Sequence, residues 1–109
     1  MTVELLYIRG CPHHKGAKKQ LMWVLKDLGI DAEVARIAIT DQAMAERLRF
    51  PGSPTIRVNG VDVVDEGHDG PFSLQCRIYR TNEGFSGSPS QESIREALGQ
   101  ARLEPGDHG

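Results

Sequence analysis

The sequence predicts an α/β domain with the element order βαβαββα and an inserted segment before the last helix. A nearly continuous apolar run at residues 3–8 stops at Gly10-Cys11-Pro12, and helical spacing of apolar residues follows it. Further along, Asn59-Gly60 separates two alternating apolar runs, which is the strongest short-range signal for a tight hairpin. A final helix is indicated by an apolar stripe at Ile94, Ala97, Leu98 and Ala101.

The first half of the chain reads as strand, helix, strand and short helix. Residues 3–8 are typical of a strand buried on both faces. Pro12 suits the first position of the following helix, with Cys11 as its N-cap, and Gly29 marks that helix's end. Residues 32–39 are rich in β-branched side chains and predict a second strand, after which Asp41 is the expected N-cap of a short helix.

The second half predicts a hairpin, an inserted segment and the last helix. The hairpin spans residues 55–64, and a capping box with proline at its first turn at residues 88–91 begins the last helix. Residues 65–87 form the insertion, in which Leu74, Cys76 and Ile78 alternate as in a short strand or a packed turn. We assign residues 1–103 to a single domain and residues 104–109 to a flexible polar tail.

Composition excludes several functional classes. The 109 residues carry 13 basic and 15 acidic side chains, and this net charge of -2 argues against bulk electrostatic binding of nucleic acid. The longest apolar runs are far shorter than the ~20 residues that cross a bilayer, so we expect no membrane association. With no leader pattern after Met1, we expect a cytoplasmic protein whose two cysteines are reduced.

Two short motifs resemble those of a known family. Gly10-Cys11-Pro12-His13-His14 after the first strand and Ser53-Pro54-Thr55 before the hairpin resemble the thioredoxin-like superfamily in its glutaredoxin-sized form. The resemblance implies a cis peptide bond before Pro54, beside the active-site Cys11. It also implies that Pro12, His13, Ser53 and Thr55 contact the substrate. The chain further resembles small thioredoxin-like proteins labelled alkylmercury lyase.

One position departs from the dithiol members of that family. His14 stands where they have a second cysteine, so no local disulfide can form. We therefore expect a monothiol cycle, or one that uses Cys76 or another molecule's sulfur, with His14 as the candidate that tunes Cys11. Gly67-His68-Asp69 faintly resembles the loop with which glutaredoxins hold the glutathione carboxylate.

The residues around Cys11 favour its thiolate form. A helix N-terminus offers free backbone amides and the positive end of the helix dipole to an anion. Residues 1–26 carry five basic side chains and one acidic side chain, although the whole chain is slightly acidic. We therefore predict that Cys11 is a nucleophile.

Cys76 has a structural and a functional interpretation. Because it alternates with Leu74 and Ile78, we favour a buried packing cysteine. If it is functional, it is a resolving cysteine, a second mercury ligand or a redox switch. Each of these roles requires Cys76 to lie near Cys11.

Three functions follow from these residues. The first is a monothiol thiol-disulfide oxidoreductase acting on a protein disulfide or a small-molecule thiol, with no required cofactor and glutathione as a candidate co-substrate. The second is binding or lyase-like cleavage of organomercurials, with Cys11 and Cys76 as the candidate mercury ligands and a carboxyl such as Asp69 as proton donor. The third is a non-catalytic binding module on the same scaffold.

Overall fold

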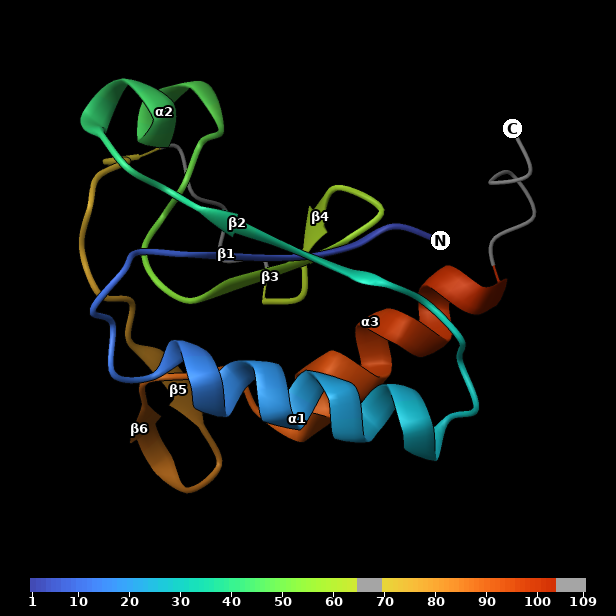
Figure 1. The fold of residues 1–109 in the computed structure, drawn as a ribbon. Helices are drawn as coiled ribbons and strands as arrows, with labels where there is room; N and C mark the ends of the chain where they lie inside the picture. The colour runs from blue at the N-terminus through green and yellow to red at the C-terminus, as the bar shows by residue number, and fades with distance from the viewer. Residues whose placement is uncertain (65–69, 104–109) are drawn as a thin grey trace.

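A four-stranded mixed sheet forms the centre of the structure, a computed structural model that describes residues 1–64 and 70–103 (Figure 1). The strand order is β2-β1-β3-β4, with β1 parallel to β2 and antiparallel to β3, and with β3 antiparallel to β4. The strands are β1 Val3–Tyr7, β2 Val34–Ala38, β3 Thr55–Val58 and β4 Val61–Asp62.

Helices cover the two faces of this sheet unequally. Helices α1 (His14–Asp27) and α3 (Gln91–Leu103) lie together on one face, whereas the short α2 (Gln42–Arg47) lies on the other face near one end (Figure 1). The larger apolar cluster lies under α1 and α3 and includes Val3, Leu5, Ala17, Leu21, Val24, Leu25, Ile56, Val58, Ile94, Leu98 and Ala101. The smaller cluster lies under α2 and includes Leu6, Ile39, Ala45 and Phe50.

Local sequence signals explain several element boundaries. The Asp41 carboxylate accepts a hydrogen bond from the backbone N–H of Met44, so Asp41 caps α2 as expected. Asn59 and Gly60 have φ values of 53° and 81°, the left-handed pair that a type I′ hairpin requires. Strand β4 is shorter than the predicted run to residue 64.

Two helix starts differ from those that we expected. The N-cap of α1 is His13, so Cys11 lies two residues before the cap and Pro12 is not the first helical residue. At α3 the Ser90 hydroxyl accepts a hydrogen bond from the Ser93 backbone N–H, and Pro89 precedes this cap. Ser90 thus caps α3, and the predicted capping box at residues 88–91 is wrong, because Gln91 is the first helical residue and not the third.

The inserted segment contains a second, two-stranded sheet. Strands β5 (Tyr79–Thr81) and β6 (Gly84–Ser86) pair antiparallel, beside the beginning of α1 (Figure 1). The prediction that Leu74, Cys76 and Ile78 form the buried face of this segment is wrong, because all three are exposed. Arg77 and Tyr79 are buried in their place, because their polar groups bond to Thr55 at the start of β3 and to the Pro54 carbonyl just before it.

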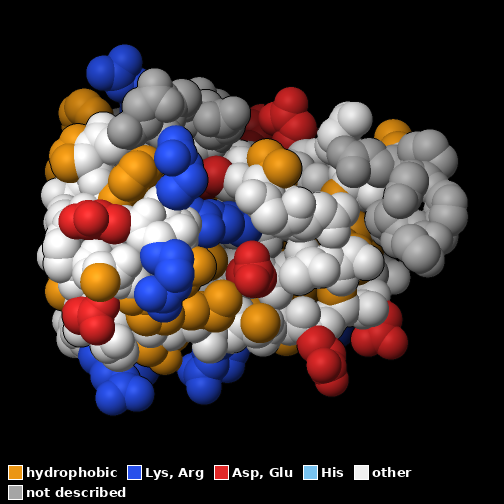
Figure 2. All heavy atoms as spheres, turned by 90° about the horizontal axis from the view of Figure 1, so that it is seen from above, with side chains coloured by type: hydrophobic (Ala, Val, Ile, Leu, Met, Phe, Trp, Pro, Cys, Tyr) orange, Lys and Arg blue, Asp and Glu red, His pale blue; other side chains and the backbone are white. Residues whose placement is uncertain are grey.

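Figure 2 looks onto the face of the molecule that carries α2. Lys and Arg side chains gather on the left of this view, around α2, with acidic and hydrophobic side chains between them. This face therefore carries mixed charge. In the part of the chain that the structure describes, no helix has the length and hydropathy that crossing a bilayer requires.

Candidate functional site

A single residue, Ile8, joins the loop that carries Cys11 to the loop that carries Pro54. The Ile8 carbonyl accepts a hydrogen bond of 3.2 Å from the Cys11 backbone N–H. The Ile8 backbone N–H donates to the Ser53 hydroxyl oxygen at 3.1 Å. Both loops are thereby fixed to the carboxyl end of β1.

Cys11 lies in the turn between β1 and α1. Gly10, with φ of 86°, makes the sharp turn that leads into it. The Cys11 residue is 5% exposed and belongs to neither apolar cluster of the described residues. Cys11 is therefore a buried residue at the carboxyl end of β1 that lies outside these two clusters.

The two histidines after Cys11 have different environments. The His14 ring stacks on Tyr7, with centroids 4.5 Å apart, and its Nδ1 lies 3.0 Å from the Cys11 carbonyl oxygen. His14 thus contacts the backbone of Cys11. The exposed His13 ring packs against Gly87, where an added Cβ would lie 2.4 Å from ring atoms.

The loop before β3 is rigidly enclosed. The Ser53–Pro54 peptide bond is cis, and Ser53, Pro54 and Thr55 are all buried. The Ser53 backbone N–H donates to the Gln75 carbonyl at 2.8 Å, and the Ser53 carbonyl accepts from the Arg77 N–H at 2.9 Å. We expected Ser53 to contact the substrate, but its backbone N–H and carbonyl are bonded to the chain's own inserted segment.

We call residues 75–79 the strap, because they bind this loop along their length. The Gln75 amide donates to the Pro51 carbonyl at 3.2 Å, and the Tyr79 hydroxyl donates to the Pro54 carbonyl. Gly52 has φ of 142° and approaches so closely that an added Cβ would lie 2.9 Å from the Arg77 Cβ. Only glycine permits this contact between loop and strap.

Arg77 is the centre of the strap's polar contacts. Its guanidinium donates to the Thr55 hydroxyl at 3.2 Å, the Asp62 carboxylate at 2.6 Å and the Val64 carbonyl at 2.7 Å. The same group lies 4.4 Å from the centroid of the Tyr79 ring. Burial raises the pKa of Asp62 above its ordinary value of 3.8, although the charge of Arg77 works in the opposite direction.

Cys76 lies in the middle of the strap. It forms a parallel bridge with Ser53, the residue before Pro54, and its side chain is exposed. The prediction that Cys76 is a packing cysteine is therefore wrong. Both cysteines are free thiols in this structure.

A small apolar groove opens beside these residues. It encloses about 310 Å³ and is lined by Ile8, Arg9, Ile39, Thr40 and Leu74. Ile8 and Arg9 lead into the Cys11 turn, and Leu74 leads into the strap. The groove is thus lined by residues that lie two or three positions before Cys11 and two positions before Cys76 in the sequence.

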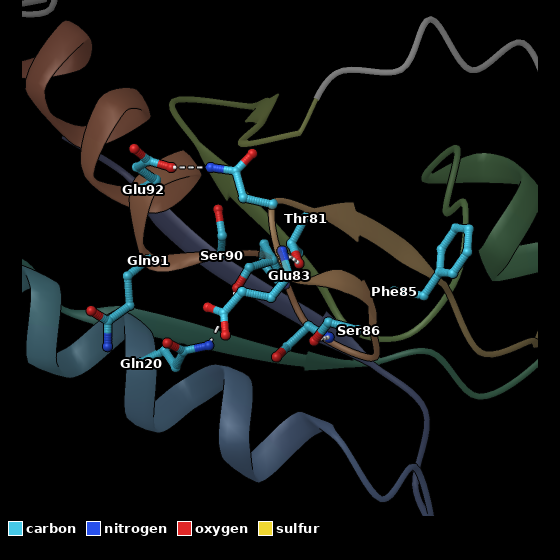
Figure 3. Close-up of a pocket in the computed structure, with 11 residues that line it drawn as sticks. Gln20, Thr81, Glu83, Phe85, Ser86, Ser90, Gln91 and Glu92 are labelled. Atoms are coloured by element: carbon cyan, nitrogen blue, oxygen red, sulfur yellow. Dashed lines mark hydrogen bonds between the residues drawn. The ribbon is translucent and has the colours of Figure 1, made fainter.

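A larger hollow lies elsewhere, between α1, the β5–β6 hairpin and the start of α3 (Figure 3). It encloses about 610 Å³ and has a polar lining that includes Gln20, Glu83, Ser90 and Glu92. Several of these polar groups are hydrogen-bonded to other residues of the lining. Gln20 donates to the Pro89 carbonyl at 3.3 Å, and Asn82 donates to Glu92 at 3.3 Å. Neither cysteine lines it.

Within residues 1–64 and 70–103, no three His, Cys, Asp or Glu side chains are grouped to hold a metal ion. Mercury ligation by Cys11 and Cys76 stays a prediction, because a soft ion can be bound by two thiolates alone. His68 and Asp69 lie outside the described residues.

Sequence reasoning missed Tyr7, Arg77 and Tyr79 as parts of this site. Tyr7 is in the strand run, and its partner His14 lies seven residues later, with no periodic pattern that links them. Arg77 and Tyr79 are the alternate positions of the segment in which we chose the wrong face. Comparison with protein families, curated proteins and solved structures found no match to this chain.

Proposed function

We propose that the protein is a thiol-disulfide exchange protein with Cys11 as its nucleophile, built on a thioredoxin-like fold. The strand order β2-β1-β3-β4 supports the fold assignment, as does the cysteine between β1 and α1. The proline that precedes β3 after a cis bond adds to this support.

The link through Ile8 is the observation that carries this proposal. The Ile8 carbonyl accepts the Cys11 backbone N–H, and the Ile8 backbone N–H donates to the Ser53 hydroxyl. A nucleophile needs a defined approach direction to its substrate, and two anchored loops provide one. Cys11 is buried but belongs to neither apolar cluster of the described residues, so it is not packed among the aliphatic side chains of those clusters.

The reaction is an exchange of sulfur partners. The Cys11 thiolate attacks one sulfur of a substrate disulfide, a mixed disulfide forms, and the other sulfur leaves as a thiolate. A second thiol then attacks the mixed disulfide and releases the substrate. In a monothiol cycle glutathione supplies that second thiol.

The relative reactivity of the two cysteines tests this proposal, because exposure and activation predict opposite orders. Cys76 is exposed and Cys11 is 5% exposed, so accessibility alone makes Cys76 react faster. We expect the opposite order at pH 7: Cys11, measured in Cys76→Ser, forms its mixed disulfide with oxidised glutathione at least about tenfold faster than Cys76, measured in Cys11→Ser.

Intact mass spectrometry after acid quenching gives both rates. The Cys11→Ser variant should also lose reductase activity toward a glutathione mixed disulfide, while Cys76→Ser keeps the ability to form the adduct at Cys11. A Cys11 that reacts more slowly than Cys76 would show that it is an inert thiol and would overturn the proposal.

A further inference from the structure

We propose that Cys76 is the second thiol of this exchange cycle, so that the protein closes an internal Cys11–Cys76 disulfide and releases its substrate without glutathione. The inference rests on the proposed function of Cys11. It assigns the resolving step to a residue 65 positions away in the chain.

The bridge to Ser53 places Cys76 at the reactive end of the sheet. Ser53 pairs with the strap in register with Cys76, and its hydroxyl accepts the N–H of Ile8. Ile8 in turn accepts the N–H of Cys11. Only short backbone-anchored contacts therefore separate the segments that carry the two thiols.

The direction of the neighbouring side chain indicates which way Cys76 faces. Arg77 reaches Thr55 and Asp62. Ile56 and Val58 point to the sheet face that α1 and α3 cover. By strand alternation Thr55 points to the other face, and Asp62, which pairs with Arg57, points there too. Successive side chains of an extended segment point to opposite sides. Cys76 therefore faces the side of the sheet on which α1 begins.

The chain beyond the strap stays on that side. Strands β5 and β6 lie beside the start of α1 (Figure 1), and Gly87 packs against the His13 ring at the α1 N-cap. Gln75 and Arg77 thus hold the strap on the Ser53 loop, and ten residues after Arg77 the chain contacts His13 through Gly87. An exposed thiol on a fixed backbone is suited to attack a neighbouring mixed disulfide.

The chemistry balances with the substrate disulfide as oxidant. The Cys11 thiolate attacks the disulfide and expels one substrate thiolate. The Cys76 thiol, after losing its proton to solvent, attacks the Cys11 sulfur of the mixed disulfide and expels the second substrate thiolate. The substrate disulfide gains two electrons and becomes two thiols, and the two cysteines lose two electrons and become one disulfide.

Reduced protein mixed with oxidised glutathione at pH 7 gives the direct test. We expect wild type to release about two glutathione thiols per chain and to lose two hydrogens in mass, whereas Cys76→Ser releases about one and keeps a glutathione adduct at Cys11. Tryptic digestion of the oxidised wild type should yield residues 10–15 joined to residues 58–77.

A relocated thiol provides the matched control. Ile78 is exposed and follows Cys76 by two residues, so that alternation puts both side chains on the same side of the chain. Ile78 lies outside the bridge with Ser53. In the double variant Cys76→Ser with Ile78→Cys, we expect the glutathione adduct at Cys11 to persist at least about tenfold longer than in wild type, because the thiol is misplaced. Equally fast closure would overturn the role of the bridge.

Other outcomes separate this inference from the proposed function. A lasting adduct at Cys11 in the wild type, or disulfides that join two chains through Cys76, would overturn the inference and leave Cys11 as a monothiol nucleophile. No adduct at Cys11 in any variant would overturn the proposed function itself.

Discussion

At the scale of single residues, His14 contacts the backbone of the turn that carries Cys11. Its ring stacks on Tyr7 and its Nδ1 lies within hydrogen-bond distance of the Cys11 carbonyl oxygen. A ring held in this way ties the turn after β1 to the strand itself. The sequence suggested that His14 tunes the Cys11 sulfur, and the contacts favour a positioning role instead.

Two substitutions separate the two contacts of His14. His14→Phe keeps an aromatic ring on Tyr7 and loses the bond to the Cys11 carbonyl, whereas His14→Gln keeps a donor and loses the ring. We expect His14→Phe to lower the free energy of unfolding by about 0.5–1.5 kcal/mol. The rate of adduct formation at Cys11 should fall with an unchanged pH profile, and His14→Gln should restore part of it.

The pH profile of adduct formation distinguishes the two roles of His14, because a ring that only positions the backbone exchanges no proton with Cys11. If His14 exchanged protons with the Cys11 sulfur, the pH profile of His14→Phe would differ in shape from that of wild type. Such a loss, with unchanged stability, would contradict the positioning role.

At the scale of elements, the ion pair between Arg77 and Asp62 joins the strap to β4. Both partners are largely buried, with side-chain exposures of 4% for Arg77 and 18% for Asp62. Removing a charge from water costs free energy that the ion pair only partly returns. This balance explains why the pKa of Asp62 is raised despite the adjacent guanidinium.

The raised pKa of Asp62 predicts a direction for the pH dependence of stability. Since the folded protein holds this proton more tightly than the unfolded chain, the Asp62 contribution to stability falls as pH rises from 3.8 through the raised value, and it stays low above that. Urea unfolding of wild type and of Asp62→Asn at several pH values isolates the contribution of Asp62 to the free energy of unfolding. We expect the stability of wild type relative to Asp62→Asn to decrease with rising pH.

The opposite slope would mean that attraction to Arg77 outweighs burial at this carboxyl. Arg77→Met in both backgrounds checks the assignment. Without the guanidinium, the decrease with rising pH should become steeper, because the partner that favours the charged form is gone.

Elements whose signals are local could be predicted from the sequence, and contacts between distant segments could not. Asp41 and Asn59-Gly60 set a cap and a turn within a few residues, and the structure has both. The strap has no such signal, because Arg77 is buried by partners as far away as Thr55. The sequence shows that apolar and polar residues alternate in this segment. The buried side chains are nevertheless Arg77 and Tyr79, and hydropathy alone would place the face with Arg77 in solvent.

At the scale of the whole molecule, the fold brings three chain segments to the carboxyl end of β1. The turn with Cys11, the loop with Ser53 and Pro54, and the strap with Cys76 meet through backbone hydrogen bonds and through the Ser53 hydroxyl, which accepts from the Ile8 N–H. Cys11 and Cys76 are far apart in sequence, so a bond between them would constrain much of the unfolded chain. The redox state should therefore set the stability of the whole domain.

Closing the Cys11–Cys76 disulfide should stabilise the protein by about 4 kcal/mol, the chain-entropy value for a closed loop of about 65 residues. Urea unfolding of wild type after oxidation with oxidised glutathione and after reduction measures this difference. Cys76→Ser, given the same two treatments, should show no comparable gain. An oxidised wild type that unfolds at lower urea than the reduced form would mean that the bond distorts the strap or the Cys11 turn, and that the two thiols are not pre-positioned.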